Sequence, residues 1–303
     1  MPAEKKTHEA RREQLIGYLA AGATLVIWTS FVLVSRLGGK SVLTSHDILA
    51  LRLITASLVL LPFAGSLPQG ALRDVRLWAL ALIGGVTYGV FAYAGFKLVP
   101  AAHGGILLSG LQPFLITAVA WLLVGTRPTR LRSIGLSAIA IGVACAAMPY
   151  FTHWSNGTLL GDALLLIASI TWAFYSVLAK RWGYSAWTLT RAVALGSALL
   201  YLPIYALWLP KQLAAAPLSM ILIQGLFQGI GATILAMLFF LRAVSSLGAE
   251  RTAALLALVP VTAGLLAVPL LDEALTGWLV SGLVFVSLGA YIASRPATSA
   301  LGK

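Results

Sequence analysis

The sequence predicts an all-α polytopic membrane protein, with ten transmembrane helices arranged as two inverted five-helix repeats. Three observations predict this fold. Hydrophobic residues make up 59% of the 303 positions and charged residues only 10%, whereas soluble domains carry about 25% charged residues. Apolar segments long enough to cross a bilayer follow one another along the chain. Finally, residues of the first half recur at matching spacings in the second half.

The spanning elements are predicted to be helices. Leu, Ala and Gly dominate the apolar runs, without the alternation of an outer-membrane barrel, and a helix satisfies its own backbone hydrogen bonds in lipid. Most segments are near the roughly 20 residues that a crossing helix needs. Breaks at polar, proline and charged clusters give ten spans: 15–37, 45–64, 76–97, 102–124, 131–149, 159–181, 186–208, 217–241, 252–271 and 276–294.

The charged N-terminus resembles the start of a signal peptide, and Ala21-Gly22-Ala23 resembles a cleavage site. That triplet lies near the beginning of the apolar run, however, and a signal peptide is cut after its apolar core. A first transmembrane helix is therefore expected. The predicted organisation is a frayed cytoplasmic tail (1–14), a first repeat (15–149), a connecting loop (150–158), a second repeat (159–294) and a second cytoplasmic tail (295–303).

The net charge of +12 comes from basic residues scattered between the apolar runs. This is typical of positive-inside loops and does not indicate a nucleic-acid site. Their bias predicts that both termini lie in the cytoplasm and that the protein is a multi-pass protein of the cell inner membrane. The expected partners are the lipid bilayer and a small-molecule substrate, and a monomer is plausible.

An internal repeat relates the two halves. Because five is an odd number of spans, the second copy enters the membrane from the opposite side, which gives a pseudo-two-fold axis in the membrane plane. Transporters use this architecture to open a central site to each side in turn. The matching residues are Gly17 with Gly161, Trp28 with Trp172, Arg52 with Arg191, Pro113 with Pro260, Gly135 with Gly282, and Gly142 with Gly289.

Three segments carry a family resemblance: "WTSFVLVSR" (28–36), "LSGLQPFLITAVAWLLVG" (108–125) and "LLALVPVTAGLLAVPLLDE" (255–273). With the ten-helix order, nearly the whole chain resembles the EamA-type members of the drug/metabolite transporter superfamily. The resemblance implies an inner-membrane exporter of amino acids or related metabolites, with a cavity lined mainly by helices 1, 3, 4, 6, 8 and 9. A glycine-glutamate pair often closes helices 4 and 9 of this family; here Gly125-Thr126 and Asp272-Glu273 keep half of it each.

Aromatic residues are expected in the middle of the membrane. Trp28 lies eleven residues beyond Gly17, which is about 16 Å along a helix and near the centre of a roughly 30 Å apolar core. Trp28 shares a helix face with Phe31, as Trp172 does with Tyr175. Either the two pairs face each other and form walls around a solute, or they pack helices 1 and 6 together.

Polar and aromatic side chains at membrane depth are further candidates, because each polar group must be satisfied in hydrocarbon. The proline positions could be hinges or could only shape the bundle, and the histidine could titrate in a vestibule or be interfacial. The predicted substrate-binding residues are Trp28, Phe31, Tyr88, Phe91, Ser109, Gln112, Trp172, Tyr175, Gln224 and Gln228. The predicted gating or hinge residues are His103, Pro113 and Pro260.

Four basic residues lie close to the ends of predicted spans: Arg36, Arg52, Lys180 and Arg191. Snorkelling to lipid headgroups is the favoured interpretation for all four. The alternative for Arg36 and Lys180, and likewise for the other two, is a role in gating the two mouths.

The acidic residues all fall in tails, loops or terminal turns of spans. Proton-driven pumps usually carry the proton on an intramembrane carboxylate, and the small multidrug relatives resemble that rule with a glutamate in their first helix. No HExxH motif or His/Asp/Glu cluster indicates an enzyme, a metal site or a cofactor. The sequence favours alternating-access export of neutral or zwitterionic metabolites, with apolar or aromatic amino acids the leading candidates, by uniport. The alternative is a proton-coupled efflux pump for lipophilic cations.

Overall fold

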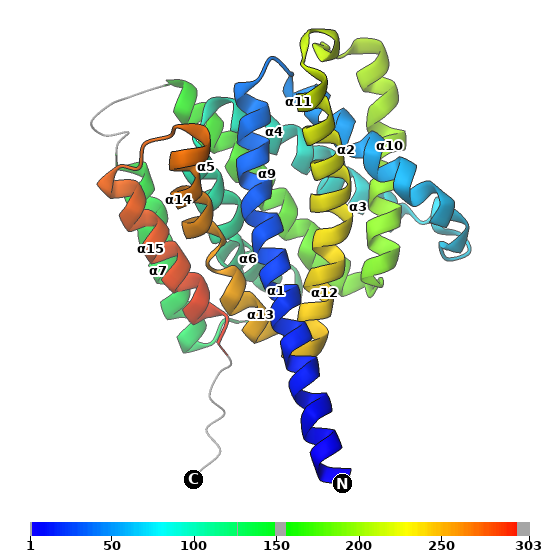
Figure 1. The fold of residues 1–303 in the computed structure, drawn as a ribbon. Coiled ribbons are helices and arrows are strands. Elements are labelled where there is room, and N and C mark those ends of the chain that lie inside the picture. The colour runs from blue at the N-terminus through cyan, green and yellow to red at the C-terminus, as the bar shows by residue number, and fades with distance from the viewer. Residues whose placement is uncertain (1, 126, 149–155, 296–303) are drawn as a thin grey trace.

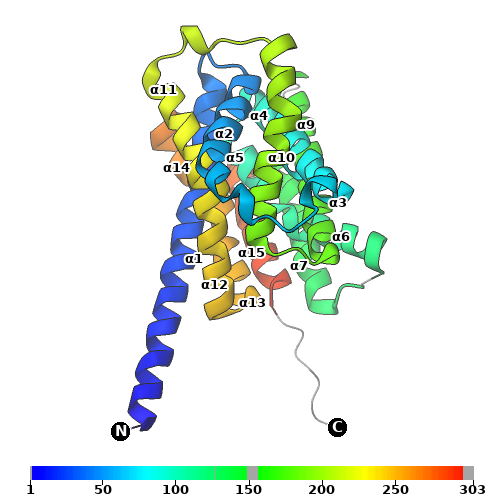
Figure 2. The same ribbon diagram turned by 90° about the vertical axis from the view of Figure 1, so that its right-hand side faces the viewer.

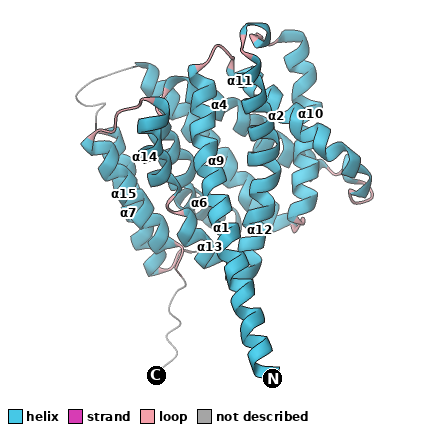
Figure 3. Ribbon diagram, in the orientation of Figure 1, coloured by secondary structure: helices cyan, strands magenta, loops and turns pink. Residues whose placement is uncertain are grey.

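The protein is a helical bundle in the computed structural model, which describes residues 2–125, 127–148 and 156–295. No strand occurs among these residues (Figure 3). Within them, eight helices are long and apolar enough to cross a membrane, and Gly277–Ala293 is a shorter apolar helix. The predicted all-α polytopic membrane fold is confirmed. Most of the predicted loop 150–158 and nearly all of the tail 295–303 lie outside the described residues.

Each half contains five helical spans, and several of these spans consist of two or three consecutive helical segments. The first half comprises α1 (Pro2–Lys40), α2 (Ser45–Leu60) with the short turns η1 (Leu61–Ser66) and η2 (Ala71–Arg73), α3 (Val75–Leu80), η3 (Ala81–Thr87), α4 (Tyr88–Leu98), α5 (Ala101–Gly104), η4 (Gly105–Gly110), α6 (Gln112–Val124) and α7 (Arg130–Ala147). The second comprises α9 (Asn156–Trp182), α10 (Ala186–Trp208), η5 (Leu213–Ala215), α11 (Leu218–Leu222), η6 (Ile223–Leu235), α12 (Ala236–Leu247), α13 (Ala249–Leu256), α14 (Val259–Leu271) and α15 (Gly277–Ala293).

The N-terminal segment continues the first spanning helix. Helix α1 begins at Pro2 and projects beyond the bundle (Figure 2), so the expectation of a frayed tail over 1–14 is wrong for residues 2–14. Proline is well suited to the first helical turn, and the following Glu, Lys, Ala and Arg residues are good helix formers. Figure 1 places the start of α1 and the end of α15 at the same end of the bundle. We call this the proximal end, and the opposite end, where α1 reaches Lys40, the distal end.

Glycines on α7 and α15 show that the two halves are inverted copies. A Cβ atom on Gly135 would lie 2.6 Å from the carbonyl oxygen of Gly289, and one on Gly142 would lie 2.8 Å from that of Gly282. These helices therefore run antiparallel in close backbone contact. Gly135 corresponds to Gly282 in the repeat and Gly142 to Gly289, so each contact joins one position to the counterpart of the other. Such a self-complementary contact is the signature of a two-fold axis.

The remaining packing follows the same symmetry. Helix α1 packs against α12 and α14, and its counterpart α9 packs against α4 and α6. The fourth and ninth spans are both interrupted immediately before a proline. The residue that precedes α6 is Leu111 (φ −76°, ψ −14°), and the one that precedes α14 is Leu258 (φ −79°, ψ −14°). Pro113 and Pro260 thus lie in the first turn of a helix instead of bending its middle, where proline would remove a hydrogen bond because it lacks the N–H.

The two broken helices also end alike, which gives a stability prediction. Gly125 (φ 76°) and Asp272 (φ 54°) both adopt the left-handed conformation, and Asp272 is the one non-glycine with positive φ among the described residues. Replacing Asp272 with Gly is expected to raise the free energy of unfolding by about 1 kcal/mol, because the strain at Cβ disappears. Denaturation in detergent measures it. Gly125→Asp should shift stability the opposite way, and an unstable Asp272→Gly protein would contradict the explanation.

Candidate solute-binding site

Aromatic rings from both halves meet inside the bundle. The ring of Trp172 on α9 lies 5.0 Å from the ring of Tyr88 on α4 and 5.0 Å from that of Tyr175. Tyr175 packs directly on Gly84, where a Cβ atom would lie 2.3 Å from the tyrosine ring. The absence of a side chain at this glycine therefore positions the aromatic pair of the second half against the third span of the first half.

Phe31 belongs to this interior, whereas Trp28 has a different partner. The ring of Phe31 lies 6.5 Å from Tyr93 and 6.3 Å from Phe96, and Phe31, Phe91 and Trp172 all pack against one hydrophobic cluster. The ring of Trp28 stacks on Phe240 of α12 at 5.6 Å. The ring contact that joins the halves at Trp172 is therefore made by Tyr88, whereas the ring of Trp28 contacts Phe240 of α12, also in the second half, instead of Trp172.

The two predicted glutamines bind the first helix. Gln224 and Gln228 are fully buried on η6. Nε2 of Gln224 donates to the carbonyl oxygen of Val34 (2.8 Å), and Nε2 of Gln228 donates to Oγ of Ser35 (3.0 Å). Oε1 of Gln228 accepts from the hydroxyl of Tyr93 (3.2 Å). These amides hold helices together at the edge of the aromatic cluster.

Arg52 lies in this interior, and sequence reasoning missed it. Its Nη1 donates to the hydroxyl of Tyr93 (3.2 Å), and its guanidinium carbon lies 5.9 Å from the centre of the Phe31 ring. The expected snorkelling is wrong because Arg52 is seven residues inside α2, roughly 10 Å from the start of the helix. It is also wrong for Arg191, which is buried and donates to the carbonyl oxygen of Phe63 (3.0 Å).

The interrupted fourth span supplies another polar group. Ser109 lies in η4, and Gln112 begins α6. Nε2 of Gln112 donates to the carbonyl oxygen of Ser169 (3.3 Å), while its buried Oε1 has no partner among the described residues. A Cβ atom on Gly105 would lie 3.2 Å from Cα of Pro260. The broken helices of the two halves therefore cross next to these polar side chains.

A buried ion pair lies at the distal end. Nε of Arg36 lies 2.6 Å from Oε1 of Glu273, and the side chains are only 15% and 9% exposed. Nη1 of Arg36 also donates to the carbonyl oxygen of Phe96 (2.8 Å), and Oε2 of Glu273 accepts from the backbone N–H of Ala101 (2.7 Å). Snorkelling of Arg36 is therefore wrong, because its partners come from the ends of the third and ninth spans, and Glu273 in turn accepts from the start of the fourth span.

A second contact at the distal end involves the predicted histidine. Nδ1 of His103 lies 2.9 Å from Oδ1 of Asp162, which joins α5 to α9. His103 is buried, and its two interpretations, as an interfacial residue and as a group that titrates in a vestibule, stay predictions. The pair borders a cavity of about 270 Å³ whose other walls are mostly apolar.

The contacts at the proximal end are more open to solvent. Nη2 of Arg242 lies 2.9 Å from Oε1 of Glu13, with side chains that are 44% and 55% exposed. The hydroxyl of Tyr184 donates to Asp74, and this hydrogen bond lowers the pKa of the Asp74 carboxyl. Lys180 is exposed at this end, as snorkelling predicts.

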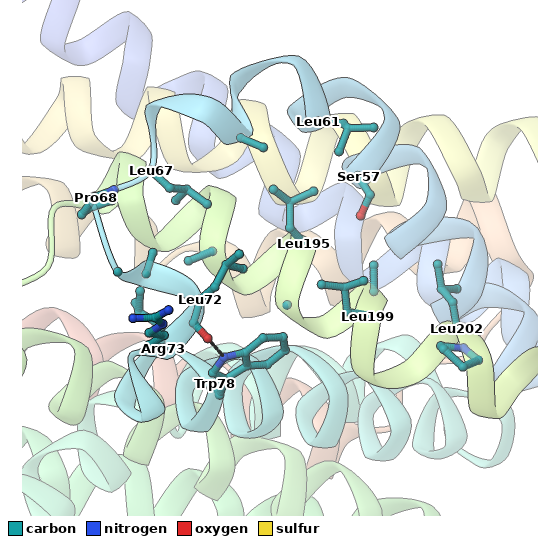
Figure 4. Close-up of a pocket in the computed structure, with 18 of the residues that line it drawn as sticks. Ser57, Leu61, Leu67, Pro68, Leu72, Arg73, Trp78, Leu195, Leu199 and Leu202 are labelled. Atoms are coloured by element: carbon teal, nitrogen blue, oxygen red, sulfur yellow. Dashed lines mark hydrogen bonds between the residues drawn. The ribbon is translucent and has the colours of Figure 1, made fainter.

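A larger cavity than the one beside His103 lies elsewhere. It measures about 970 Å³ and opens between α2, with the turns that follow it, and α10 (Figure 4). Its lining is apolar apart from Ser57, Arg73 and Trp78, and Nε1 of Trp78 donates to the carbonyl oxygen of Leu72 (2.9 Å). None of the predicted substrate-binding residues lines it. Polar groups that could orient a solute are few here, whereas they converge around Tyr93.

The described residues contain no group of three His, Cys, Asp or Glu side chains that could hold a metal ion. The buried polar side chains described above instead hydrogen-bond to neighbouring helices.

Comparison with known proteins gives consistent matches. The profile of the EamA-like transporter family matches twice, at residues 15–148 and 159–295. The chain is 28% identical over 295 residues to "Uncharacterized inner membrane transporter YedA" of Escherichia coli K12, covering 93% of this chain and 94% of that protein. It is 24% identical over 250 residues to "Uncharacterized transporter YyaM" of Bacillus subtilis 168, covering 78% and 79%.

A solved crystal structure supports the same fold, with a TM-score of 0.61 at 23% identity over 93% of this chain and 97% of that chain. Both halves carry the family profile, and together the two matches span most of the sequence. The inverted five-helix copies, the paired proline breaks and the aromatic interior thus belong to a member of the EamA-like transporter family.

Proposed function

We propose that this transporter is an alternating-access exporter of small neutral or zwitterionic metabolites, with amino acids bearing apolar or aromatic side chains the leading candidates. It operates by facilitated diffusion in the inner membrane, with both termini cytoplasmic. The observation that carries the proposal is the convergence of aromatic rings from both halves, Phe31 and Tyr88 on one side and Trp172 on the other, beside the two broken helices. Interrupted helices around a central site are typical of secondary transporters.

The two ends differ in a way that suits alternating access. The distal ion pair of Arg36 and Glu273 is almost sealed from solvent, whereas the proximal pair of Arg242 and Glu13 is about half exposed. Under the proposed orientation, the structure represents a state closed toward the outside. Opening to the outside requires that the Arg36–Glu273 pair separate while contacts at the proximal end form.

The absence of an intramembrane carboxylate among the described side chains favours uniport. Asp47 is fully buried and the side chain of Glu273 is only 9% exposed, and both lie at the distal end. Asp47 accepts hydrogen bonds from Tyr205 (2.6 Å) and from the backbone of Gln212 (3.0 Å). A proton-coupled pump for lipophilic cations is the alternative. Arg52 disfavours it, because a cation in the aromatic interior would be repelled by the guanidinium.

Radiolabelled counterflow in proteoliposomes tests the proposal. With a panel of the twenty amino acids and with purines, the expected result is flux of one or more apolar or aromatic amino acids that persists after an uncoupler collapses the proton gradient. Flux that disappears with the gradient would favour the proton-coupled alternative. No counterflow for any solute of the panel would contradict export of these metabolites.

A further inference from the structure

We propose that Arg52 binds the carboxylate group of the transported solute, so that the substrates are small carboxylates with an apolar or aromatic remainder. This inference rests on the proposed transport function and names the solute class of the same site. It follows from the surroundings of a single guanidinium, from the charges that are missing around it and from a comparison with its counterpart in the other half.

The guanidinium of Arg52 is only partly used by the protein. Arginine has five N–H donors in a planar fork that matches a carboxylate. In the described part of the chain, the one hydrogen bond of the Arg52 side chain goes to the hydroxyl of Tyr93. The other two guanidinium nitrogens make no hydrogen bond there and are not fully buried. The residue as a whole is partly exposed. These donors are therefore accessible to a ligand.

No counter-ion for Arg52 occurs within the described residues. The three ion pairs there involve Arg36, His103 and Arg242. Asp47, on the same helix, is occupied by Tyr205 and by backbone N–H groups at the distal end. A cation at membrane depth normally pairs with an anion or with backbone carbonyls. A solute carboxylate would supply the missing partner.

The counterpart of Arg52 in the second repeat is a control within the chain. Arg191 is only 3% exposed, and it donates to the carbonyl oxygens of Trp187 (3.2 Å) and Phe63 (3.0 Å) and to the hydroxyl of Ser66. Its donors thus fix the segment that follows α2. The same repeat position has a structural role in one half and open donors in the other, which indicates that Arg52 is kept for a ligand.

The groups beside Arg52 suit the remainder of such a solute. Phe31 lies 5.9 Å away as an aromatic face, and it packs against the hydrophobic cluster that contains Tyr88. Tyr88 in turn contacts Trp172. A carboxylate held at Arg52 therefore places an apolar side chain among rings that come from both halves.

Ligand-induced thermal stabilisation of the purified protein tests the inference, with three probes: L-phenylalanine, L-phenylalaninamide and 3-phenylpropionate. The two carboxylates should stabilise the wild-type protein and the amide should not. The Arg52→Gln protein should lose at least about thirtyfold in apparent affinity for the carboxylates, as expected when one partner of a desolvated charge pair is removed. Equal stabilisation by the amide, or unchanged affinity in Arg52→Gln, would overturn the inference.

Two further variants make the result specific. Arg73→Gln removes an exposed arginine that lines the cavity of about 970 Å³ between α2 and α10. This variant should bind the probes like the wild type. Loss of binding there would place the carboxylate site in that cavity and overturn the assignment. Arg52→Lys keeps the charge but not the bidentate geometry. The Arg52→Lys protein should bind the carboxylate probes at least tenfold more weakly than the wild type. This measurement tests the inference even if the Arg52→Gln protein does not fold.

Transport data separate failure of this inference from failure of the proposed function. Counterflow of a solute that lacks a carboxylate, unaffected by Arg52→Gln, would leave transport in place and overturn the role of Arg52. Absence of all counterflow combined with Arg52-dependent binding of the carboxylate probes would contradict export and support the carboxylate site.

Discussion

Replacing Gly289 with Ala is expected to lower the free energy of unfolding by at least about 2 kcal/mol, because overpacking against rigid neighbours costs typically 1–3 kcal/mol and the obstacles here are backbone atoms. The new Cβ would lie 2.5 Å from the carbonyl oxygen of Gly135 and 2.7 Å from the backbone nitrogen of Ile139. No side-chain rotation can relieve these contacts, so α7 and α15 must separate. Unfolding in detergent measures the change.

Gly22→Ala is the matched control. A Cβ atom at Gly22 in α1 would meet nothing within 4 Å, and alanine is the better helix former by about 1 kcal/mol. This variant should be as stable as the wild type or slightly more stable. A Gly289→Ala protein that unfolds at the wild-type denaturant concentration would show that α7 and α15 are not in backbone contact.

Replacing Glu273 with Gln is expected to destabilise the protein by about 3 kcal/mol, the size of effect seen when one member of a buried ion pair is removed. Arg36 would keep its charge and lose its carboxylate, although the carbonyl oxygen of Phe96 would still accept from it. In the proposed alternating-access cycle this pair closes the distal end, so the variant should also populate the distally open state more often.

The neighbouring acid provides the control for this variant. Asp272 is exposed, and Asn adopts the left-handed conformation at least as readily, so Asp272→Asn should change stability by less than about 0.5 kcal/mol. Accessibility of a cysteine introduced at Phe31, in a Cys145→Ser background, reports the opening. Equal stability of the two variants would contradict a sealed ion pair at this end.

The sequence was sufficient to predict the features that depend on local composition or on the repeat. The apolar segments define the spans, and the spacing of Gly135 and Gly142 relative to Gly282 and Gly289 indicated the inverted relation that their contacts confirm. The paired prolines were expected to be hinges or to shape the bundle, and the structure places each of them in the first turn of a helix that follows an interruption.

The roles of the charged residues could not be predicted in the same way. The partner of Arg36 lies 237 positions away in the chain, and that of Arg52 lies 41 positions away. Proximity to a helix end suggested lipid headgroups, but the partners come from other helices that the fold brings together. The signal that could have found Arg52 is its distance from the start of α2, which places it well below the membrane surface.

The position of Trp28 shows a similar limit. Helical spacing correctly placed Trp28 and Phe31 on neighbouring turns of α1, but one face of a helix is wide enough to meet two different neighbours. Phe31 meets α4, whereas Trp28 meets Phe240 on α12. Only the packing of the whole bundle decides which of the two rings reaches the interior.

The antiparallel contact between α7 and α15 has a consequence for the proposed alternating-access cycle. An exchange of roles between the halves converts the Gly135–Gly289 contact into the Gly142–Gly282 contact and leaves the pair of helices as a whole unchanged. This pair can therefore act as a stationary pivot about which the other helices rock. A covalent cross-link between its two members should leave turnover intact, whereas one across the distal mouth should stop it.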